Sequence, residues 1–309
     1  MLVVALVVQL VLGAGLVVVA INGFPLIGGG GDGKSDRAPA VAPPVPKPTA
    51  DQFHAPRAFA LIRRELSYGQ RPAGSPQLRR LSEVLRRELP NGHFEPVPGH
   101  PGLRNVVGTI PGHAPAIVVG AHYDSEYHPK GFVGANDSAA GTAAVVELAR
   151  DLAGTSYPNS REVRFVLFDG EEEGPGCSNA RFDKCALRGS RAYVAAHRRE
   201  VGQMVLLDYI ANQGVRLPRE GSSEPALWAR VRAAANEVGV GAVFPPSRQV
   251  TIYDDHTPFL RAGIPAVDLI DFSYRYADGL KDTIDKLSVA SLDAVGETVF
   301  ALLSELRAA

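Results

Sequence analysis

The sequence is poor in sulfur-containing residues and in tryptophan, and it has no excess of either charge. Its 309 residues include two cysteines, two methionines and one tryptophan. Two cysteines are too few to staple a small disulfide-rich domain. The 32 lysines and arginines nearly balance the 33 aspartates and glutamates, whereas nucleic-acid-binding proteins usually carry a basic excess. The composition therefore excludes a disulfide scaffold and argues against a nucleic-acid partner.

The remaining composition is that of a folded globular protein. Hydrophobic residues make up 45% of the chain and there are 32 glycines, as in α/β proteins rather than disordered chains. From residue 55 onwards, apolar runs such as EVRFVLFDG (162–170) alternate with segments such as 75–89, whose apolar residues recur every three or four positions. The runs predict buried strands and the segments predict amphipathic helices. We therefore expect an α/β fold, a three-layer α/β/α sandwich with a mixed, mainly parallel central sheet.

The N-terminal segment is almost entirely apolar. Residues 2–21 read LVVALVVQLVLGAGLVVVAI, with Gln9 as the single polar side chain, and about 20 such residues span a bilayer as a helix. No lysine or arginine precedes the run and no small-x-small cleavage site follows it, which favours an uncleaved signal-anchor over a cleaved signal peptide; a buried helix is the remaining alternative. We expect residues 1–22 to be a signal-anchor or signal peptide, which makes the protein extracytoplasmic and either membrane-anchored or secreted.

A glycine- and proline-rich stretch follows this segment. The glycines at 28–31 are typical of a flexible chain, and APAVAPPVPKPTA (38–50) is typical of a stiff, extended one. We therefore interpret residues 23–49 as a linker. Residues 50–309 are long enough to form one domain with a substantial core.

Acidic and histidine side chains follow three of the predicted buried strands. His122 and Asp124 come after IVVGA, Glu171 and Glu172 come after RFVLFDG, and Asp208 ends MVLLD. Ligands bind at the carboxyl ends of parallel strands, so these metal-type side chains are expected to converge. His122 and Asp124 are two residues apart and point to one face of an extended chain. One of them is therefore suited to bind a metal while the other supports it.

Three further candidates have different structural alternatives. Asp137, in GANDSAAG, begins a predicted helix, and a role as the helix cap alone explains it equally well. Asp208 lies within the apolar VLLDYIA, where a buried carboxylate needs a partner or a metal. His256, in YDDHTPF, is more typical of a structural hydrogen-bonding residue.

Five segments, in order, resemble the motifs of the zinc-dependent exopeptidase family, which includes bacterial leucyl aminopeptidases, glutamate carboxypeptidases and glutaminyl cyclases. They are GAHYDS, GFVGANDSAAG, FDGEEEG with LRGSRAYV, LLDYIA, and DDHTPFLRAGIPAVDLIDF. With RPAGSP and NVVGTIPG upstream, the resemblance spans roughly residues 55–309. It implies a phosphorylase/hydrolase-like α/β fold, two Zn²⁺ ions and peptide substrates.

The resemblance also implies a set of metal ligands. Asp137 would bridge the two zinc ions. His122 and Asp208 would complete one metal site, and Glu172 would belong to the other. A carboxylate suits the bridging position because two cations about 3.5–4 Å apart need a ligand with two oxygens.

Other residues would act around these ligands. By resemblance, Glu171 is the general base that takes a proton from the zinc-activated water, and Asp124 is the partner of His122. Asp254 and His256 would support the ligands or line the substrate pocket. Glu173 has no role in the family, and we interpret it as a solvated loop charge.

One expected ligand departs from the family pattern. The family has a histidine in a WHTxxDTxDKLS-like segment, and the matching segment here, YADGLKDTIDKLS (276–288), places Asp278 at that position. Asp278 replaces the histidine as an oxygen ligand, which zinc accepts, or a nearby group replaces it, or the site binds metal weakly and the protein has little activity. An all-carboxylate site is also more open to manganese or magnesium.

We therefore predict a metal-dependent hydrolase of the aminopeptidase type, which cleaves N-terminal residues from peptides. Two alternatives stay open. The first is a glutaminyl-peptide cyclotransferase, which DDHTPFL and LLDYIA also resemble. By that resemblance, however, the cyclases depend on the metal site at which this chain has Asp278 instead of histidine. They also place a tryptophan beside that histidine, where this chain has Ala277. A weakly active binding ectodomain is supported only by Asp278.

The two cysteines lie just beyond the glutamates. Cys177 and Cys185 have seven residues between them in GPGCSNARFDKCALRGS. In an extracytoplasmic domain we expect them to form a disulfide rather than two unlinked thiols. The segment has no histidine or third cysteine to complete a zinc knot. The closed loop would overhang the active site.

Overall fold

The structure is a computed structural model that describes residues 44–155, 159–177 and 179–308. The predicted signal-anchor or signal peptide (1–22) and most of the predicted linker (23–49) lie outside these residues. Within the part of the chain described, no helix has the length and apolarity needed to cross a membrane.

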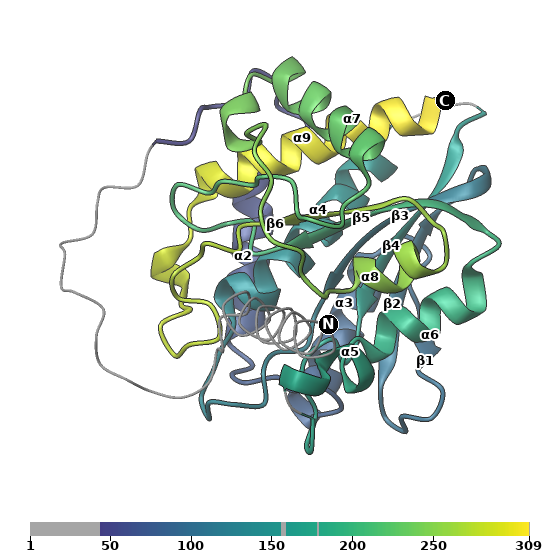
Figure 1. Ribbon diagram of the computed structural model, residues 1–309, viewed down its shortest axis with the longest axis vertical. Helices are drawn as coiled ribbons and strands as arrows, with labels where there is room; N and C mark the ends of the chain where they lie inside the picture. Colours follow the sequence, from purple (N-terminus) through teal and green to yellow (C-terminus); the bar gives the residue numbers. More distant parts are fainter. Residues whose placement is uncertain (1–43, 156–158, 178, 309) are drawn as a thin grey trace, which may run out of the picture. The chain divides into compact units, whose positions relative to one another are not determined.

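The described residues form eight helices and a six-stranded sheet (Figure 1). The helices are α2 (Ala55–Leu66), α3 (Pro76–Glu88), α4 (Gly141–Ala153), α5 (Phe182–Cys185), α6 (Arg188–His197), α7 (Pro225–Glu237), α8 (His256–Arg261) and α9 (Val289–Ala308). The strands are β1 (His93–Pro96), β2 (Arg104–Ile110), β3 (His113–His122), β4 (Arg161–Phe168), β5 (Val201–Asp208) and β6 (Ala266–Ile270).

The sheet is mixed, with a parallel central part. The strand order is β1-β2-β4-β3-β5-β6. β3 runs parallel to β4 and β5, and β5 runs parallel to β6, while β2 pairs antiparallel with both β1 and β4. The predicted mixed, mainly parallel sheet is confirmed. β1 was not predicted, because this four-residue edge strand has no buried position and hence no apolar run.

Helices cover both faces of the sheet (Figure 1). Alternate residues of a strand point to opposite faces, and β3 divides accordingly. Val119 belongs to the larger core, together with residues of α2, α3, α4, α7 and α9. Its neighbour Val118 belongs to a second core with residues of α6 and α8. This is the three-layer arrangement that the alternation of strands and helices predicts.

α4 begins at Gly141 and continues from the helical segment Ala135–Ala140, in which Asp137 marks a kink with the non-helical φ −112° and ψ 89°. Asp137 thus lies directly before the helical backbone that leads into α4, and its side chain accepts a hydrogen bond from the Tyr209 hydroxyl. Gly141 permits a close approach to β5, because a Cβ there would lie 2.2 Å from the carbonyl oxygen of Leu207. The segment is thereby pressed against the carboxyl end of the sheet.

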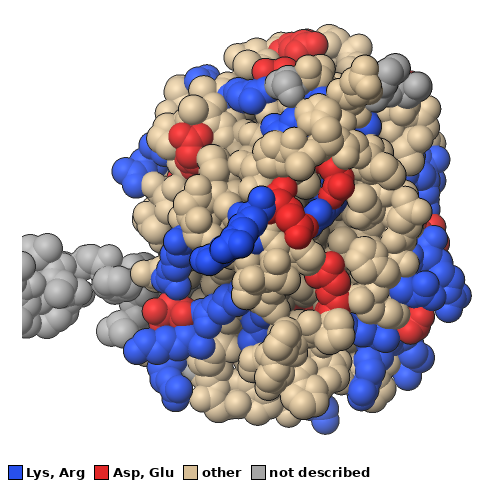
Figure 2. Space-filling model, turned by 90° about the vertical axis from the view of Figure 1, so that its right-hand side faces the viewer, with Lys and Arg blue, Asp and Glu red and all other residues tan. Residues whose placement is uncertain are grey.

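Charges of both signs are spread over the surface. Figure 2 shows one face of the molecule, on which lysine and arginine side chains lie interspersed with aspartates and glutamates. This distribution is what the balanced composition predicts.

Candidate metal centre

The central strands bring the predicted site residues together at their carboxyl ends. His122 is the last residue of β3, which lies between β4 and β5 in the sheet. Glu171 and Glu172 follow β4, and Asp208 ends β5. All four side chains are buried. The convergence that the strand ends predict is therefore present.

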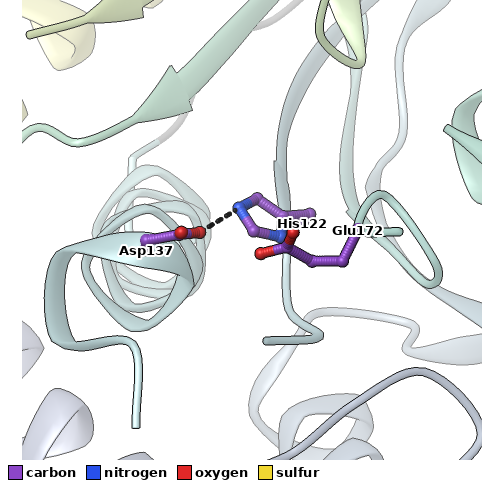
Figure 3. Close-up of side chains that lie close together, drawn as sticks. All are labelled: His122, Asp137 and Glu172. Atoms are coloured by element: carbon purple, nitrogen blue, oxygen red, sulfur yellow. Dashed lines mark ion pairs between the residues drawn. The ribbon is translucent and has the colours of Figure 1, made fainter. Parts of the chain in front are cut away.

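The two ring nitrogens of His122 face different carboxylates. Nε2 lies 3.1 Å from Oδ1 of Asp137 (Figure 3) and 3.7 Å from Oδ1 of Asp208. Nδ1 lies 3.6 Å from Oδ1 of Asp124 and 3.9 Å from Oε2 of Glu171. Nε2 is thus directed at two of the predicted ligands, and Nδ1 faces the predicted partner.

Glu172 lies close to the same group. One donor atom each of His122, Asp137 and Glu172 lies within 4.8 Å of the other two, which is close enough to surround one ion. The three side chains come from β3, the helical segment before α4 and the turn after β4, and Figure 3 shows them pointing toward one another.

Asp124 holds the turn that carries both glutamates. Its Oδ1 accepts a hydrogen bond from the backbone N–H of Glu171 at 3.2 Å, and its Oδ2 accepts one from Glu172 at 3.3 Å. Arg188 fixes the same turn, because its guanidinium donates to the carbonyl oxygens of Gly170 at 3.0 Å and Glu172 at 2.7 Å. Asp124 therefore positions two acidic side chains in addition to facing His122. The contribution of Arg188 was not predicted.

The backbone of Asp137 is held by a residue that the sequence analysis missed. The Asp282 carboxylate accepts hydrogen bonds from the backbone N–H of Asn136 at 3.0 Å and of Asp137 at 3.1 Å. The Tyr274 hydroxyl donates to Asp282 Oδ1 at 2.7 Å. Asp282 lies in the segment DTIDKLS, which was used only to place Asp278. The acidic residues of this segment were the only sequence feature that could have indicated the role of Asp282.

Asp278 reaches the centre, as predicted, but through a tyrosine. It lines the same cavity as His122 and Glu172. The Tyr209 hydroxyl donates to Asp278 Oδ1 at 3.1 Å and lies 3.2 Å from Asp137 Oδ2. Tyr209 directly follows Asp208, and nothing in the sequence distinguished its hydroxyl from that of a core tyrosine.

The centre opens into a cavity of about 290 Å³. Its wall combines one imidazole, several carboxylates and a number of apolar side chains: His122; Glu126, Asp137, Glu171, Glu172, Glu173, Asp208, Asp254 and Asp278; and Phe182, Tyr209, Ile252, Tyr253, Ile270 and Phe272, with Thr251. No lysine or arginine lines it within the described part of the chain. Glu173 is half-buried in this wall, so its interpretation as a free loop charge needs correction.

The electrostatics of the centre are those of a site that lacks positive charge. Burial raises the pKa of Glu171 and of Glu172 well above the ordinary value, and it raises the pKa of Asp208 to about 7. Burial lowers the pKa of His122, but hydrogen bonding to Asp124, Asp137 and Asp208 outweighs burial and holds this pKa well above its usual range.

The residues fit a bound zinc ion. Glu172 Oε1 is buried and has no hydrogen-bond partner among the described residues, and His122 Nε2 faces the carboxylates of Asp137 and Asp208. Carboxylate oxygen and imidazole nitrogen are ligands that zinc accepts. A cation would lower the pKa values of the carboxylates and release their protons.

His256 lies in a second buried cluster. Its Nε2 is 2.9 Å from Ser222 Oγ and 3.2 Å from Glu220 Oε2, and its Nδ1 is 3.8 Å from Asp268 Oδ2. Asp254, the other predicted supporting residue, connects this cluster to the cavity wall. The contacts of His256 favour its structural interpretation. Glu220 had no sequence signal, whereas Asp268 lies within the apolar run AVDLI and had the same signal as Asp208.

Cys177 and Cys185 are joined by a disulfide, as predicted. The bond closes the loop that contains α5, and Phe182 of this helix lines the cavity. The disulfide-closed loop therefore contributes to the wall of the site.

Comparison with known proteins identifies the family. Residues 105–303 match peptidase family M28. A glutaminyl-peptide cyclotransferase of Bothrops jararaca is 28% identical over 236 residues, which cover 63% of this chain and 63% of that protein. Aminopeptidase YwaD of Bacillus subtilis (strain 168) is 28% identical over 209 residues, which cover 62% of this chain and 41% of that protein. The chain thus spans less than two thirds of the length of these curated relatives.

Solved structures show the same fold. A glutaminyl cyclase of Porphyromonas gingivalis is 26% identical, with a TM-score of 0.73, over 83% of this chain and 99% of that chain. A leucine aminopeptidase precursor from Bacteroides thetaiotaomicron, 24% identical, has a TM-score of 0.73 over 83% of this chain and 98% of that chain. The match to the family covers β2 to α9 and with them every residue placed at the centre, and the chain therefore belongs to peptidase family M28.

Proposed function

We propose that this protein is a metal-dependent aminopeptidase that removes N-terminal residues from peptides. The position of His122 carries the proposal. Its Nε2 faces Asp137 and Asp208 together, while Glu172 approaches Asp137 from another strand end. This arrangement supplies ligands for two cations that share Asp137, as a two-zinc hydrolase requires.

The ligand assignment is the one that the family resemblance implies, and these contacts support it. His122, Asp137 and Asp208 would hold one ion, and Asp137, Glu172 and Asp278 would hold the other. Zinc, when bound, lowers the pKa of a water molecule to about 7 and polarises a carbonyl oxygen.

Glu171 is suited to move the proton. Its side chain lines the cavity, and its backbone is fixed by Asp124. A carboxylate at this place can accept a proton from water and return it. Glu171 would take the proton of the attacking water and deliver it to the leaving amine.

The cavity wall favours a substrate with a free N-terminus. Its carboxylates, among them Glu126 and Glu173, attract an α-ammonium group, and no fixed cation competes for them among the described lining residues. Phe182, Ile252 and Phe272 provide apolar surface for the first side chain of the peptide. Peptides are therefore the expected partners.

Glutaminyl cyclisation is the second candidate. The similarity to cyclases from Bothrops jararaca and Porphyromonas gingivalis favours it. The residue before Asp278 is Ala277, however, and the single tryptophan, Trp228, packs on Phe244 in the core with ring centroids 6.2 Å apart. This chain therefore has no indole at the position where we expect one in a cyclase.

Parallel assays on the 7-amido-4-methylcoumarin derivatives of leucine and glutamine separate the two activities. An aminopeptidase releases the free coumarin from such a substrate. A cyclase instead converts the glutamine derivative into its pyroglutamyl form with loss of ammonia, and it leaves the leucine derivative intact. Cyclisation without hydrolysis would select the second candidate, and absence of either metal-dependent turnover would select a weakly active binding ectodomain.

The role of Glu171 is tested in the same assay. Glu171→Gln should lower kcat about 10²- to 10⁴-fold while the metal content stays at the wild-type level. Glu305→Gln, on the exposed part of α9, is the matched control and should keep the kcat and the metal content of the wild type. Unchanged hydrolysis by Glu171→Gln, or less than one metal ion bound per wild-type chain, would contradict the proposal.

We also propose the arrangement of the whole chain. Residues 1–22 would serve as a signal-anchor or signal peptide, residues 23–49 as a linker, and residues 50–309 as the catalytic domain. The disulfide between Cys177 and Cys185 supports an extracytoplasmic location.

A further inference from the structure

We propose that the two cation positions of this centre differ in chemistry. The position beside His122 takes zinc, and the position between Asp137, Glu172 and Asp278 takes a harder divalent cation, for which Mn²⁺ is the test case. The inference rests on the two-cation centre of the proposed function and adds the identity of the second metal.

The first step is the donor set. His122 is the only imidazole in the cavity wall among the residues described. Its Nε2 is directed at Asp137 and Asp208, so it serves the position between them. In the ligand assignment of the proposed function, the other position then has oxygen donors alone, from Asp137, Glu172 and Asp278. Imidazole suits zinc, whereas carboxylate oxygen suits magnesium, calcium and manganese.

The second step is that this position is built to receive an ion. Glu172 is 6% exposed, lines the cavity, and has an Oε1 atom without a hydrogen-bond partner among the described residues. A buried carboxylate oxygen is costly to leave unpaired. It is therefore available as a ligand.

The third step is the support of Asp278. The Tyr209 hydroxyl lies 3.1 Å from Asp278 Oδ1 and 3.2 Å from Asp137 Oδ2. Tyr209 is buried and packs against Tyr274, with ring centroids 6.0 Å apart. Tyr274 in turn donates to Asp282, which holds the backbone of Asp137. Tyr209 thus fixes Asp278 relative to Asp137 from a rigid part of the fold, as partners of metal ligands do.

The fourth step concerns selectivity. Zinc outranks manganese in raw affinity at most protein sites. Replacement of an imidazole by a carboxylate should therefore lower the ratio of zinc affinity to manganese affinity. That ratio should be high at the His122 position and much lower at the Asp278 position. One equivalent of zinc should accordingly occupy the His122 position and leave the other to manganese.

The test counts bound manganese directly. The full chain is stripped with a chelator and given one equivalent of zinc, and Mn²⁺ is then titrated in. The electron paramagnetic resonance signal of free Mn²⁺ reports how much has bound, and elemental analysis after gel filtration reports zinc. We expect one Mn²⁺ and one Zn²⁺ per chain.

Three variants sharpen the result. Asp278→His restores an imidazole, so a second zinc should exclude Mn²⁺ from this position. Asp278→Asn should lose Mn²⁺ without gaining zinc. Tyr209→Phe removes only the supporting hydroxyl and should weaken Mn²⁺ binding about 10- to 100-fold, with the first zinc retained. Retention of that zinc also shows that each variant is folded.

The inference is overturned if the wild type takes a second zinc to the exclusion of Mn²⁺, or if Asp278→His leaves the ratio of bound manganese to zinc unchanged. Its failure is distinguishable from failure of the proposed function. If the protein binds two zinc ions and hydrolyses aminoacyl substrates, the assignment of Mn²⁺ to the second position is wrong and the proposed aminopeptidase function stands. Binding of one ion of each kind without hydrolysis of aminoacyl substrates supports the metal assignment and removes the aminopeptidase.

Discussion

Two buried histidines, His122 and His256, lie among carboxylates at the same end of the sheet. Each belongs to a group of three side chains whose donor atoms lie within 4.8 Å of one another: His122 with Asp137 and Glu172, and His256 with Asp254 and Asp268. Judged by residue type and distance alone, both groups are suited to hold a metal ion. They differ in access, because His122 lines the cavity and His256 does not.

One carboxylate beside each histidine, Glu220 beside His256 and Glu172 beside His122, also differs in how far the protein itself satisfies it. Glu220, beside His256, accepts backbone N–H hydrogen bonds from Ser222 at 2.9 Å, Ser223 at 2.7 Å and Ile252 at 2.9 Å. Burial raises the pKa of Glu220, but its hydrogen bonds to His256 and to these amides outweigh burial and lower the pKa to about 2. Glu172, beside His122, keeps an unpaired Oε1, and its pKa is raised well above the ordinary value.

The difference separates a structural carboxylate from a metal ligand. The fold supplies the hydrogen bonds that an ionised Glu220 needs, so this charge stabilises the native state. It withholds them from Glu172, whose charge is destabilising until a cation arrives. Asp254 and Asp268, in the His256 group, also have buried oxygen atoms without hydrogen-bond partners among the described residues. Access of its histidine to the cavity is therefore what marks the His122 group as the metal centre.

The largest contrast should appear in zinc affinity. His122→Asn removes a nitrogen ligand and should weaken the tighter zinc site more than about 100-fold, since the loss of a ligand's supporting partner alone costs about 10- to 100-fold. His256→Asn should lower thermal stability but keep zinc affinity near the wild-type value. Competition with a fluorescent chelator measures both. Equal loss of zinc in the two variants would erase the distinction.

A smaller contrast is expected in stability without metal. Glu220→Gln should destabilise the fold by about 2 kcal/mol, the scale of hydrogen bonds to a charged group, which lowers Tm by about 4–8 °C. The folded pKa of about 2 lies below the ordinary 4.5. The contribution of Glu220 is therefore present above pH 4.5 and is lost as the pH falls toward 2.

Thermal scans of wild type and Glu220→Gln at pH 7 and at pH 3.5 measure this difference. The gap in Tm should be largest at pH 7 and should narrow at pH 3.5. Glu237→Gln, at the exposed end of α7, is the matched control and should shift Tm little at either pH. A gap that does not change with pH would mean that the charge of Glu220 contributes nothing.

The sequence was sufficient for features that leave a local pattern. Apolar runs located β2 to β6, and the polar residues directly after them, among them His122 and Glu171, located the centre because parallel strands end at one edge. The edge strand β1 was missed because it lacks a buried run. The kink at Asp137 could not be read from NDSAAG, because it is held by Asp282, which is 145 residues away.

Supporting residues could not be predicted, because their partners are remote in sequence. Asp282 binds the backbone of Asn136, 146 residues away, and Tyr209 reaches Asp278 across 69 residues. The disulfide was predictable because only two cysteines exist. Whether a buried acidic residue is a ligand or a structural group depends on which backbone amides face it, as Glu172 and Glu220 illustrate, and that follows from the tertiary structure.

The smallest expected effect has the opposite sign to that of Glu220. Because burial raises the pKa of Glu172 above 4.5 in the metal-free fold, its contribution to stability is full below pH 4.5 and is lost as the pH rises above that value. Glu172→Gln cannot ionise and should escape this loss. At pH 7 the metal-free variant should therefore be more stable than the wild type by about 1 kcal/mol, or about 2–4 °C in Tm.

Zinc should then reverse the order. Ligands that bind only the folded state raise its stability according to their affinity, so added zinc should raise Tm more in the wild type than in Glu172→Gln. Thermal scans with chelator and with zinc measure both shifts on the same samples. If Glu172→Gln is less stable than the wild type in chelator, Glu172 is a structural carboxylate like Glu220, and the contrast between the two clusters does not hold. The predicted gain without metal and loss with metal would instead show that this fold keeps an unsatisfied charge at the centre for the cation it binds.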